Sequence, residues 1–533
     1  MNLQNDRSGG QQQSRAPLYE ALLAYRERKD ASFHVPGHKD GEAVRQIEGS
    51  FASAAAGHPL ARMMELDVTE ITGTDDLHHP EGAILEAQRL AAAVFGAEET
   101  FFLVGGSTAG NLAMILSACS APGDVLLVQR NVHKSVIHGL MLAGARTVFL
   151  APRLDPASGL ATIPSEATVR EALSRYPGAK GLLVTHPNYY GMGASLAPLA
   201  KLCAASGVPL LVDEAHGAHY GLHPALPASA LEQGAGAVVQ STHKMLGALT
   251  MGAMLHVQGG LLDRTLLRQR LAMVQSSSPS YPIMASLDLC RCQLASSGTA
   301  YFESALATAD KLRRGIRDLS RFGLLAPEPG ASGADAAYAI QDPFKVVIYD
   351  AAGIWSGYQL QTLLEAAGCV PEMSDERYVV LALGPGSRLQ DADRLLKALK
   401  ELSKDDVSTW NIANKEVQAS LEQADKGNKP GAELEPVSSP VRFSLRPIAA
   451  GNIESVPLSD CAGRLAAEMV VPYPPGIPIL YPGERISEQR SLQLHQLRDS
   501  QAKCQAVKDV TLSTIQVIIK DIEESREFLV ERS

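Results

Sequence analysis

The 533-residue sequence lacks a long hydrophobic run and lacks an excess of positive charge. A membrane-spanning helix needs about 20 consecutive apolar residues, and no such stretch occurs. The net charge is −10, which makes nucleic acid and anionic membranes unfavourable partners. The first fifteen residues, MNLQNDRSGGQQQSR, are polar and do not resemble a signal peptide. We therefore expect a cytoplasmic globular protein that binds neither membrane nor nucleic acid.

Cysteine and aromatic residues are also scarce. No C-x-x-C pair occurs, and the cysteines stand alone at positions 119, 203, 290, 292, 369, 461 and 504. This spacing is not that of a zinc site or of a disulfide framework, so we expect reduced thiols and no bound metal. Aromatic residues make up only 5% of the chain, whereas Ala and Gly are plentiful, as in proteins whose helices pack closely on a sheet.

What the sequence does contain is a series of short apolar runs that alternate with helical segments. We predict strands at FFLV (101–104), VLLV (125–128), TVFL (147–150), GLLVT (181–185), PLLVD (209–213), AVVQ (237–240) and GAMLHV (252–257). Helical patterns occupy 108–120, 135–144, 165–176 and 196–206. Continuous apolar strands separated by helices predict an α/β fold with a mostly parallel seven-stranded sheet covered on both faces.

The remaining segments predict further units. An amphipathic helix is expected at 16–30, mostly helical structure at 263–325, a smaller α+β unit beyond it, and a strand at 509–519 followed by a helix at 520–533. The prolines of 471–484 favour extended structure. The predicted division is an N-terminal tail and segment (1–60), a large domain (61–325), a small α+β domain (326–403), a linker (404–440) and an extra C-terminal domain (441–533).

Polar clusters follow five of the predicted strands. In open parallel sheets, ligands bind outside the carboxyl ends of the strands. One cluster contains Lys244, and a buried lysine is costly unless it is paired or converted, for example into a Schiff base with an aldehyde cofactor. Another, GGSTAGN (105–111), opens a helix and so offers free N–H groups to a phosphate, although Ser107 or Thr108 could equally be a simple helix cap.

This combination matches what pyridoxal 5'-phosphate requires. Lys244 would hold the cofactor covalently, and Asp213 would pair with its ring nitrogen. Ala215 is small enough to lie under the ring, and His133 could stack on it; the structural alternatives are a turn cap at Asp213 and a core histidine at 133. The residues expected to bind the phosphate are Ser107, Thr108, Ser241 and His243.

The same residues carry a family resemblance. The sequence resembles the bacterial ornithine/lysine/arginine decarboxylases, which have the aspartate aminotransferase-like fold of the PLP-dependent transferases. The matching motifs are FHVPGHKDG (33–41), GTDDLHHPEG (73–82), GGSTAGN (105–111), NVHKS (131–135), THPNYYG (185–191), VDEAHGAH (212–219), STHK (241–244), SSSPSYPIMASLD (276–288) and YPPGIP (473–478). The resemblance implies catalytic roles for Lys244, Asp213 and His133, and adds His216 to the residues that contact the cofactor.

The resemblance also implies an assembly and a reaction. The first motif begins near residue 33 without the N-terminal regulator-like domain of the large acid-inducible members, so the chain is most similar to the short Bacillus-type enzymes. We expect a homodimer, or an oligomer built from dimers, to which 73–82 and 276–282 contribute across the interface. The expected reaction is conversion of arginine to agmatine and CO2, with lysine to cadaverine or ornithine to putrescine as the next choices.

Two matters stay open at this point. Acceptors for a basic substrate side chain are sought in acid-rich loops, which offer Asp75, Asp76, Glu372 and Asp375. An aminotransferase or lyase acting on another amino acid is the alternative enzyme, although His133 stands where aminotransferases usually place an aromatic ring. A catalytically silent regulatory protein is the alternative of another class, and the presence of both Lys244 and Asp213 argues against it.

Overall fold

A large sheet forms the centre of the molecule. The computed structural model describes residues 13–45, 59–327, 336–404, 435–473, 475–500 and 502–519. The strand order of the sheet is β1-β8-β7-β6-β4-β2-β3-β14. Its strands are β1 (Glu99–Leu103), β2 (Val125–Gln129), β3 (Arg146–Leu150), β4 (Leu182–Thr185), β6 (Leu210–Asp213), β7 (Ala237–Gln240), β8 (Ala253–Val257) and β14 (Val441–Arg442).

The prediction of a mostly parallel seven-stranded sheet is confirmed. Strands β3, β2, β4, β6 and β7 run parallel, and β8 lies antiparallel between β7 and β1. The short β14 adds an eighth, antiparallel strand at the edge beside β3. Because β14 follows the predicted linker, the beginning of the predicted C-terminal domain is joined to the large sheet.

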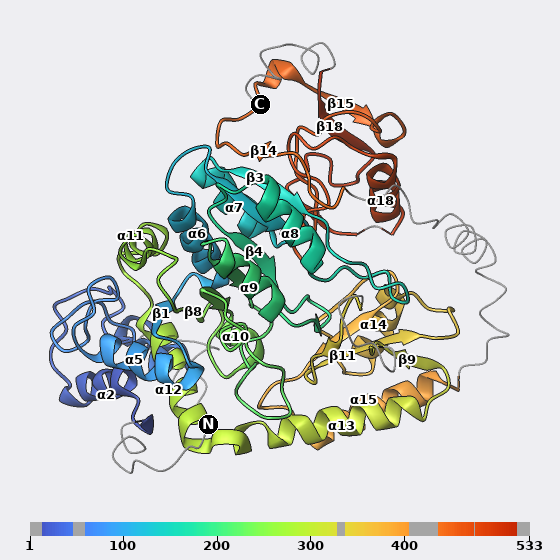
Figure 1. The fold of residues 1–533 in the computed structure, drawn as a ribbon. Coiled ribbons are helices and arrows are strands. Elements are labelled where there is room, and N and C mark those ends of the chain that lie inside the picture. The colour runs from blue at the N-terminus through green and yellow to red at the C-terminus, as the bar shows by residue number, and fades with distance from the viewer. Residues whose placement is uncertain are drawn as a thin grey trace.

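Both faces of the sheet are buried, which is why apolar residues follow one another along its central strands. In β2, Leu126 and Val128 pack in one hydrophobic cluster and Leu127 in another. The first cluster includes residues of α6 (Gly106–Ala118), α7 (Lys134–Ala143) and α11 (Arg264–Val274). The second includes residues of α8 (Glu166–Arg175) and α9 (Ala197–Ala205), so the helices form two layers around the sheet (Figure 1).

The N-terminal helix belongs to a third packed layer. Helix α2 (Pro17–Arg28) contacts α5 (Ala83–Phe95) and α12 (Tyr281–Ser297), and the three lie together at one end of the molecule (Figure 1). The buried carboxylate of Asp288 accepts a hydrogen bond from the backbone N–H of Leu18 at 2.9 Å and pairs with Arg291. Short helices α3 (Glu42–Arg45) and α4 (Pro59–Met64) follow α2.

The predicted small α+β unit is present as a four-stranded antiparallel sheet. Its order is β12-β13-β11-β9, with helices α13, α14 and α15 packed beside it. A separate two-stranded ladder joins β10 to β5 of the large domain. The bounds are β5 (Met192–Gly193), η1 (Gly298–Tyr301), α13 (Glu303–Arg317), β9 (Phe322–Leu324), β10 (Ile340–Gln341), β11 (Lys345–Asp350), α14 (Gly357–Ala366), β12 (Met373–Ser374), β13 (Val379–Ala382) and α15 (Leu389–Leu402).

The described residues of the C-terminal part form two small ladders, β15-β18 and β16-β17, one α-helix and two 3-10 helices. The strand predicted at 509–519 is β18, and the predicted helix at 520–533 lies outside the described residues. Residues 405–434 of the predicted linker also lie outside them, whereas Val437 forms a β-bridge with Leu150. The bounds are η2 (Ala450–Asn452), β15 (Ile453–Pro457), η3 (Leu458–Asp460), β16 (Val471–Pro472), α18 (Glu488–Asp499), β17 (Cys504–Gln505) and β18 (Thr514–Ile518).

A buried ion pair attaches this part to the large domain. Arg130, directly after β2, contacts the carboxylate of Glu484 at 2.7 Å and donates to the carbonyl oxygens of Pro478 and Ile479. Both side chains of the pair are largely shielded from solvent. Arg130 also lies over the ring of Tyr481, 4.7 Å from its centre. The loop that follows β16 is thereby held against the carboxyl ends of the large sheet.

Candidate active site

The candidate site lies where the parallel strands end. Strands β2, β4, β6 and β7 run in the same direction, so their carboxyl ends share one edge of the sheet. Asp213 ends β6, and the chain after β7 forms a single helical turn, α10 (Thr242–Met245). Helix α6 packs closely on β7 because Gly110 has no side chain: a Cβ there would collide with Val239. This approach brings the beginning of α6 to the same edge.

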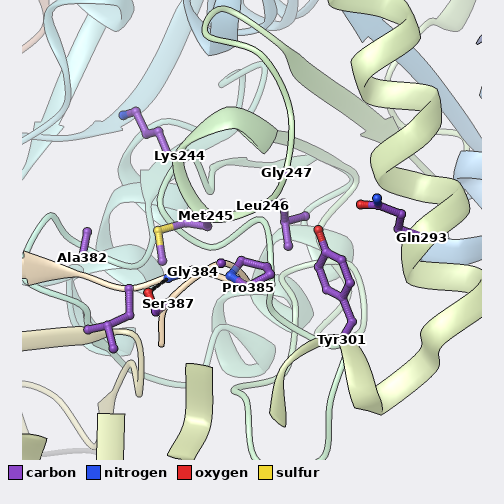
Figure 2. Close-up of a pocket in the computed structure, with 12 residues that line it drawn as sticks. Lys244, Met245, Leu246, Gly247, Gln293, Tyr301, Ala382, Gly384, Pro385 and Ser387 are labelled. Carbon is purple, nitrogen blue, oxygen red and sulfur yellow. Dashed lines mark hydrogen bonds between the residues drawn. The ribbon is translucent and has the colours of Figure 1, made fainter. Parts of the chain in front are cut away.

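Lys244 projects from α10 toward the strand ends and keeps part of its surface exposed to solvent. Its Nζ lies 3.0 Å from Nε2 of His216 and 5.8 Å from the centre of the Tyr189 ring. Burial lowers the pKa of the Lys244 ammonium, and the carboxylates of Asp213 and Glu372 oppose that shift. Figure 2 shows the amine directed away from Met245 and Tyr301, which line a pocket behind α10 together with residues 382–387. The amine is therefore directed to the strand ends and not into that pocket.

Asp213 is buried and oriented by two hydrogen bonds. Its Oδ2 accepts from Nδ2 of Asn111 at 2.8 Å, and its Oδ1 accepts from the backbone N–H of Ala215 at 3.1 Å. Asn111 Nδ2 also donates to Oγ of Ser135 at 3.0 Å. Neither partner carries a charge, so the negative charge of the carboxylate is available to a cationic group of a bound molecule. Asn111 belongs to the GGSTAGN motif, although the motif alone gave it no role.

His133 is held as a neutral ring beside these groups. It is the cap of α7: its Nδ1 accepts from the backbone N–H of Ser135 at 3.2 Å and lies 2.8 Å from Oγ of the same residue. Burial lowers the pKa of His133 to about 4, against the opposing effect of Asp213. A Cβ placed on Gly476 would lie 3.0 Å from the ring, so the C-terminal loop closes one side of the histidine. His133 therefore caps a helix and is not the core histidine of the structural alternative, and the Nε2 edge of its ring lies against the loop.

The polar groups expected to bind a phosphate are placed consistently with that role. Ser107 and Thr108 lie in the first turn of α6, whose cap residue Gly105 offers no side chain to the helix N–H groups. Within the part of the chain that the structure describes, Oγ of Ser241 and Oγ1 of Thr185 are buried without a hydrogen-bond partner. Buried hydroxyls without partners are costly, so a ligand that supplies acceptors satisfies them. His243 is half-buried, and its Nδ1 lies 3.0 Å from the carbonyl oxygen of Gly252, which leaves Nε2 for a ligand. Ala215 is buried two residues after Asp213.

Two residues that the sequence did not single out complete the cluster. Lys345 begins β11 of the small domain and is only 2% exposed; its Nζ lies 3.3 Å from Nδ1 of His216. Tyr189 packs against the His216 ring, with a centre-to-centre distance of 4.2 Å, and donates its hydroxyl to Glu372. Tyr189 lies in the THPNYYG motif, whereas nothing local marks Lys345, which arrives from a different domain.

The four candidate acceptors for a substrate side chain separate into two groups. Glu372 lies beside Tyr189 and near Lys244 and Lys345. Its negative charge opposes the lowering of the pKa of both lysines. Asp75, by contrast, accepts backbone N–H groups of Asp76, Glu81, Gly82, Ile84 and Leu85. It therefore satisfies the beginning of α5, and this local role replaces the expected substrate contact.

The other two candidates are also engaged locally. Asp76 accepts the backbone N–H of His78, and Asp375 accepts N–H groups of Arg377 and Tyr378 and the hydroxyl of Tyr190. Both carboxylates therefore hold the backbone of their own loops in place. Of the four carboxylates, the geometry supports Glu372 alone as a candidate for the substrate side chain.

Segments 73–82 and 276–282, both expected at a subunit interface, meet within the chain. Nε2 of His78 lies 2.8 Å from the carbonyl oxygen of Ser276, and the Tyr281 hydroxyl donates to the carbonyl oxygen of Asp75 at 2.6 Å. All seven cysteines are free thiols. Among the described residues no cluster of His, Cys, Asp and Glu could hold a metal ion, and no helix is both long and apolar enough to span a membrane.

A lysine at the carboxyl edge of the sheet, a carboxylate on a neighbouring strand end and unsatisfied hydroxyls beside a helix N-terminus together fit pyridoxal phosphate, and the fold is that of the enzymes that use it. Comparison with known proteins specifies the family. Residues 16–391 match the model of the Orn/Lys/Arg decarboxylase major domain, and residues 431–506 match the C-terminal domain of the same family. The chain belongs to this family and is a pyridoxal phosphate-dependent amino acid decarboxylase.

Individual relatives are similar to this chain over most of its length. The Bacillus subtilis (strain 168) protein YaaO is 41% identical over 90% of this chain and 94% of its own. Arginine decarboxylase of Bacillus anthracis is 35% identical over 95% of this chain and 98% of its own. Among solved structures, lysine decarboxylase LdcF of Francisella novicida has a TM-score of 0.77 at 21% identity and covers 94% of this chain and 81% of its own, which supports the fold.

Proposed function

We propose that the protein converts arginine to agmatine and CO2. The observation that carries this substrate is the full-length similarity to arginine decarboxylases of several Bacillus species, at 34–36% identity over 88% or more of the chain. Lysine and ornithine, the other substrates in the family description, are the next candidates.

Pyridoxal phosphate, when bound, withdraws electrons from the substrate Cα and so permits loss of the carboxylate as CO2. The residues of the chain prepare this chemistry. Lys244, whose pKa is lowered by desolvation, would supply the amine that bonds to an aldehyde carbon. Asp213 holds negative charge where a protonated ring nitrogen would need it, and Asn111 keeps that carboxylate in place.

The remaining residues are proposed to bind the cofactor and the substrate and to enclose the site. Ser107, Thr108 and Ser241 are proposed to bind the phosphate, and neutral His133 to pack on the ring. Glu372 is proposed to accept the cationic end of the substrate, because it is the acidic candidate that lies beside Tyr189 and Lys244. The loop around Gly476 shields His133 from solvent.

A homodimer in the cytoplasm, acting in polyamine synthesis, is proposed with this function. Seven free cysteines suit a reducing compartment, and agmatine is a precursor of polyamines. Sedimentation analysis of the purified protein tests the assembly, and a monomer with full activity would contradict the dimer.

The substrate is tested by supplying arginine, lysine and ornithine separately and identifying the amine products by mass spectrometry. We expect agmatine to form with the highest kcat/KM. Preference for lysine or ornithine would correct the substrate within the same reaction. A keto acid in place of CO2 and an amine would overturn the assignment in favour of an aminotransferase.

A further inference from the structure

His216 lies between the amines of two lysines, of which Lys345 is buried. Its Nε2 is 3.0 Å from Nζ of Lys244, and its Nδ1 is 3.3 Å from Nζ of Lys345. The two lysines come from different domains, since Lys244 follows β7 of the large sheet and Lys345 begins β11 of the small one. The imidazole thus joins the cofactor lysine to a second lysine for which the proposed function has no use.

The chemistry of a neutral imidazole restricts this arrangement to two states. A neutral ring has one nitrogen that donates and one that accepts. In the first state, charged Lys345 donates to Nδ1, and the hydrogen on Nε2 points to the lone pair of a neutral Lys244 amine. In the second state, the roles are exchanged and Lys244, as an ammonium or as a neutral amine, donates to Nε2. Only the first state requires Lys244 to be unprotonated, which is the form that bonds to an aldehyde carbon.

The surroundings of the ring make it neutral and supply charge near Lys345. Burial, followed by the two lysines, lowers the pKa of His216 well below its usual value. Burial lowers the pKa of Lys345 to about 8, against the opposing effects of Asp342 and Glu372, so this lysine stays mostly protonated at neutral pH. Asp342 is held near it by hydrogen bonds from His219 and from the backbone N–H of Phe344.

Tyr189 covers the cluster and lies near the amines of both lysines. The centre of its ring lies 5.3 Å from Nζ of Lys345 and 5.8 Å from Nζ of Lys244. A ring face stabilises a nearby cation, so this contact contributes to keeping one of the two lysines charged in a buried site. The other charged or titratable groups that act on the cluster are Asp213, Glu372, His133 and His243.

We propose that Lys345 is a positioning residue that holds His216 in the tautomer with hydrogen on Nε2, so that Lys244 faces a donor and is kept unprotonated. This role rests on the proposed function of Lys244 as the cofactor-binding lysine. Lys345 itself touches neither reacting atom; it acts through His216.

The test is a pH titration of the visible absorption of the purified enzyme with its cofactor bound. This absorption reports protonation of the Lys244 nitrogen in its linkage to the cofactor. In Lys345→Met the ring is free to turn its Nε2 lone pair to that nitrogen, so the midpoint should rise by about one pH unit or more. Lys345→Arg keeps the charge and should titrate within a few tenths of a unit of the wild type. Lys311→Met, at a partly exposed lysine paired with Asp393, is the control that should not shift.

Two further readouts separate the possible failures. Borohydride trapping and peptide mapping of the wild type locate the modified lysine; absence of cofactor on Lys244 contradicts the proposed function itself. Cofactor on Lys244 together with an unchanged midpoint in Lys345→Met overturns only the role of Lys345. If Lys345→Met does not fold, ring-¹⁵N-histidine NMR of the wild type decides the question, with the His216 signal identified by its loss in His216→Gln. An unprotonated Nδ1 supports the proposal, and a protonated Nδ1 overturns it.

Discussion

Gly476 of the C-terminal part lies against the imidazole of His133 at the carboxyl edge of the large sheet. A Cβ on Gly476 would lie 3.0 Å from both Cδ2 and Nε2 of that ring, and the backbone N–H of Lys134 donates to the Gly476 carbonyl oxygen at 2.9 Å. The contact is made at a φ of +86°, where a side chain is strained. A segment more than 340 residues downstream therefore shapes the surroundings of a candidate catalytic residue.

Gly476→Ala should disturb the candidate site as well as the backbone. We expect a loss of about 1 kcal/mol in the free energy of unfolding from the left-handed backbone alone. In addition, displacement of His133 should weaken cofactor binding, measured by titration of the cofactor-free protein. Gly463→Ala is the matched control, because Gly463 has a φ of +79° and no neighbour within 4 Å of an added Cβ. Equal cofactor affinities in the two variants would refute a role for the His133 contact.

Lys244→Ala should remove catalysis without removing the fold. The variant loses the amine that can attach the cofactor, and truncation of this single side chain leaves the surrounding strands intact. We expect a cooperative melting transition, no cofactor retained after borohydride reduction and denaturing gel filtration, and no measurable release of CO2. Lys201→Ala, at an exposed position of α9, should behave as the wild type. Covalent cofactor in the Lys244→Ala protein would show that another lysine is used.

Arg130→Met should destabilise the attachment of the C-terminal part. The substitution leaves the buried Glu484 carboxylate without its cationic partner, at a cost of about 3–5 kcal/mol. Chemical denaturation followed by fluorescence should show the loss. The control is Arg170→Met, which breaks an exposed pair with Glu166 within α8 and should cost less than about 1 kcal/mol. Equal effects of the two substitutions would mean that the buried pair does not hold the domains together.

Glu372→Gln should change substrate binding, whereas Asp75→Asn should change stability. Glu372 lies beside Tyr189 and near Lys244 and Lys345, so loss of its charge should raise KM for the basic substrate about tenfold. This change corresponds to about 1.4 kcal/mol of binding free energy. Asp75 accepts backbone N–H groups at the start of α5, so Asp75→Asn should lower the melting temperature and leave KM unchanged. An unchanged KM in Glu372→Gln would remove Glu372 from the substrate site.

The seven-stranded sheet could be predicted because each strand is a short apolar run buried on both faces. The runs at 125–128 and 237–239 show this, since all their residues are apolar and helices cover both faces of the sheet. Two-residue strands such as β5, β10 and β14 could not be predicted. They are strands because of the segments they pair with, and their own side chains carry no strand pattern. The turn of helix at Thr242–Met245 was likewise hidden in a segment that reads as a loop.

The sequence by itself determined which lysine, carboxylate and hydroxyl residues meet at one edge of the sheet, and so predicted Lys244, Asp213 and the phosphate-binding candidates, because all of them follow strands whose common direction brings their ends together. Only the tertiary structure decided the use of groups that arrive from elsewhere. It placed Lys345 of the small domain against His216 and Gly476 of the C-terminal part against His133, and it gave Asp75 to a helix N-terminus. The physical reason is that these contacts join residues far apart in the chain, so no local pattern of charge or hydrophobicity records them.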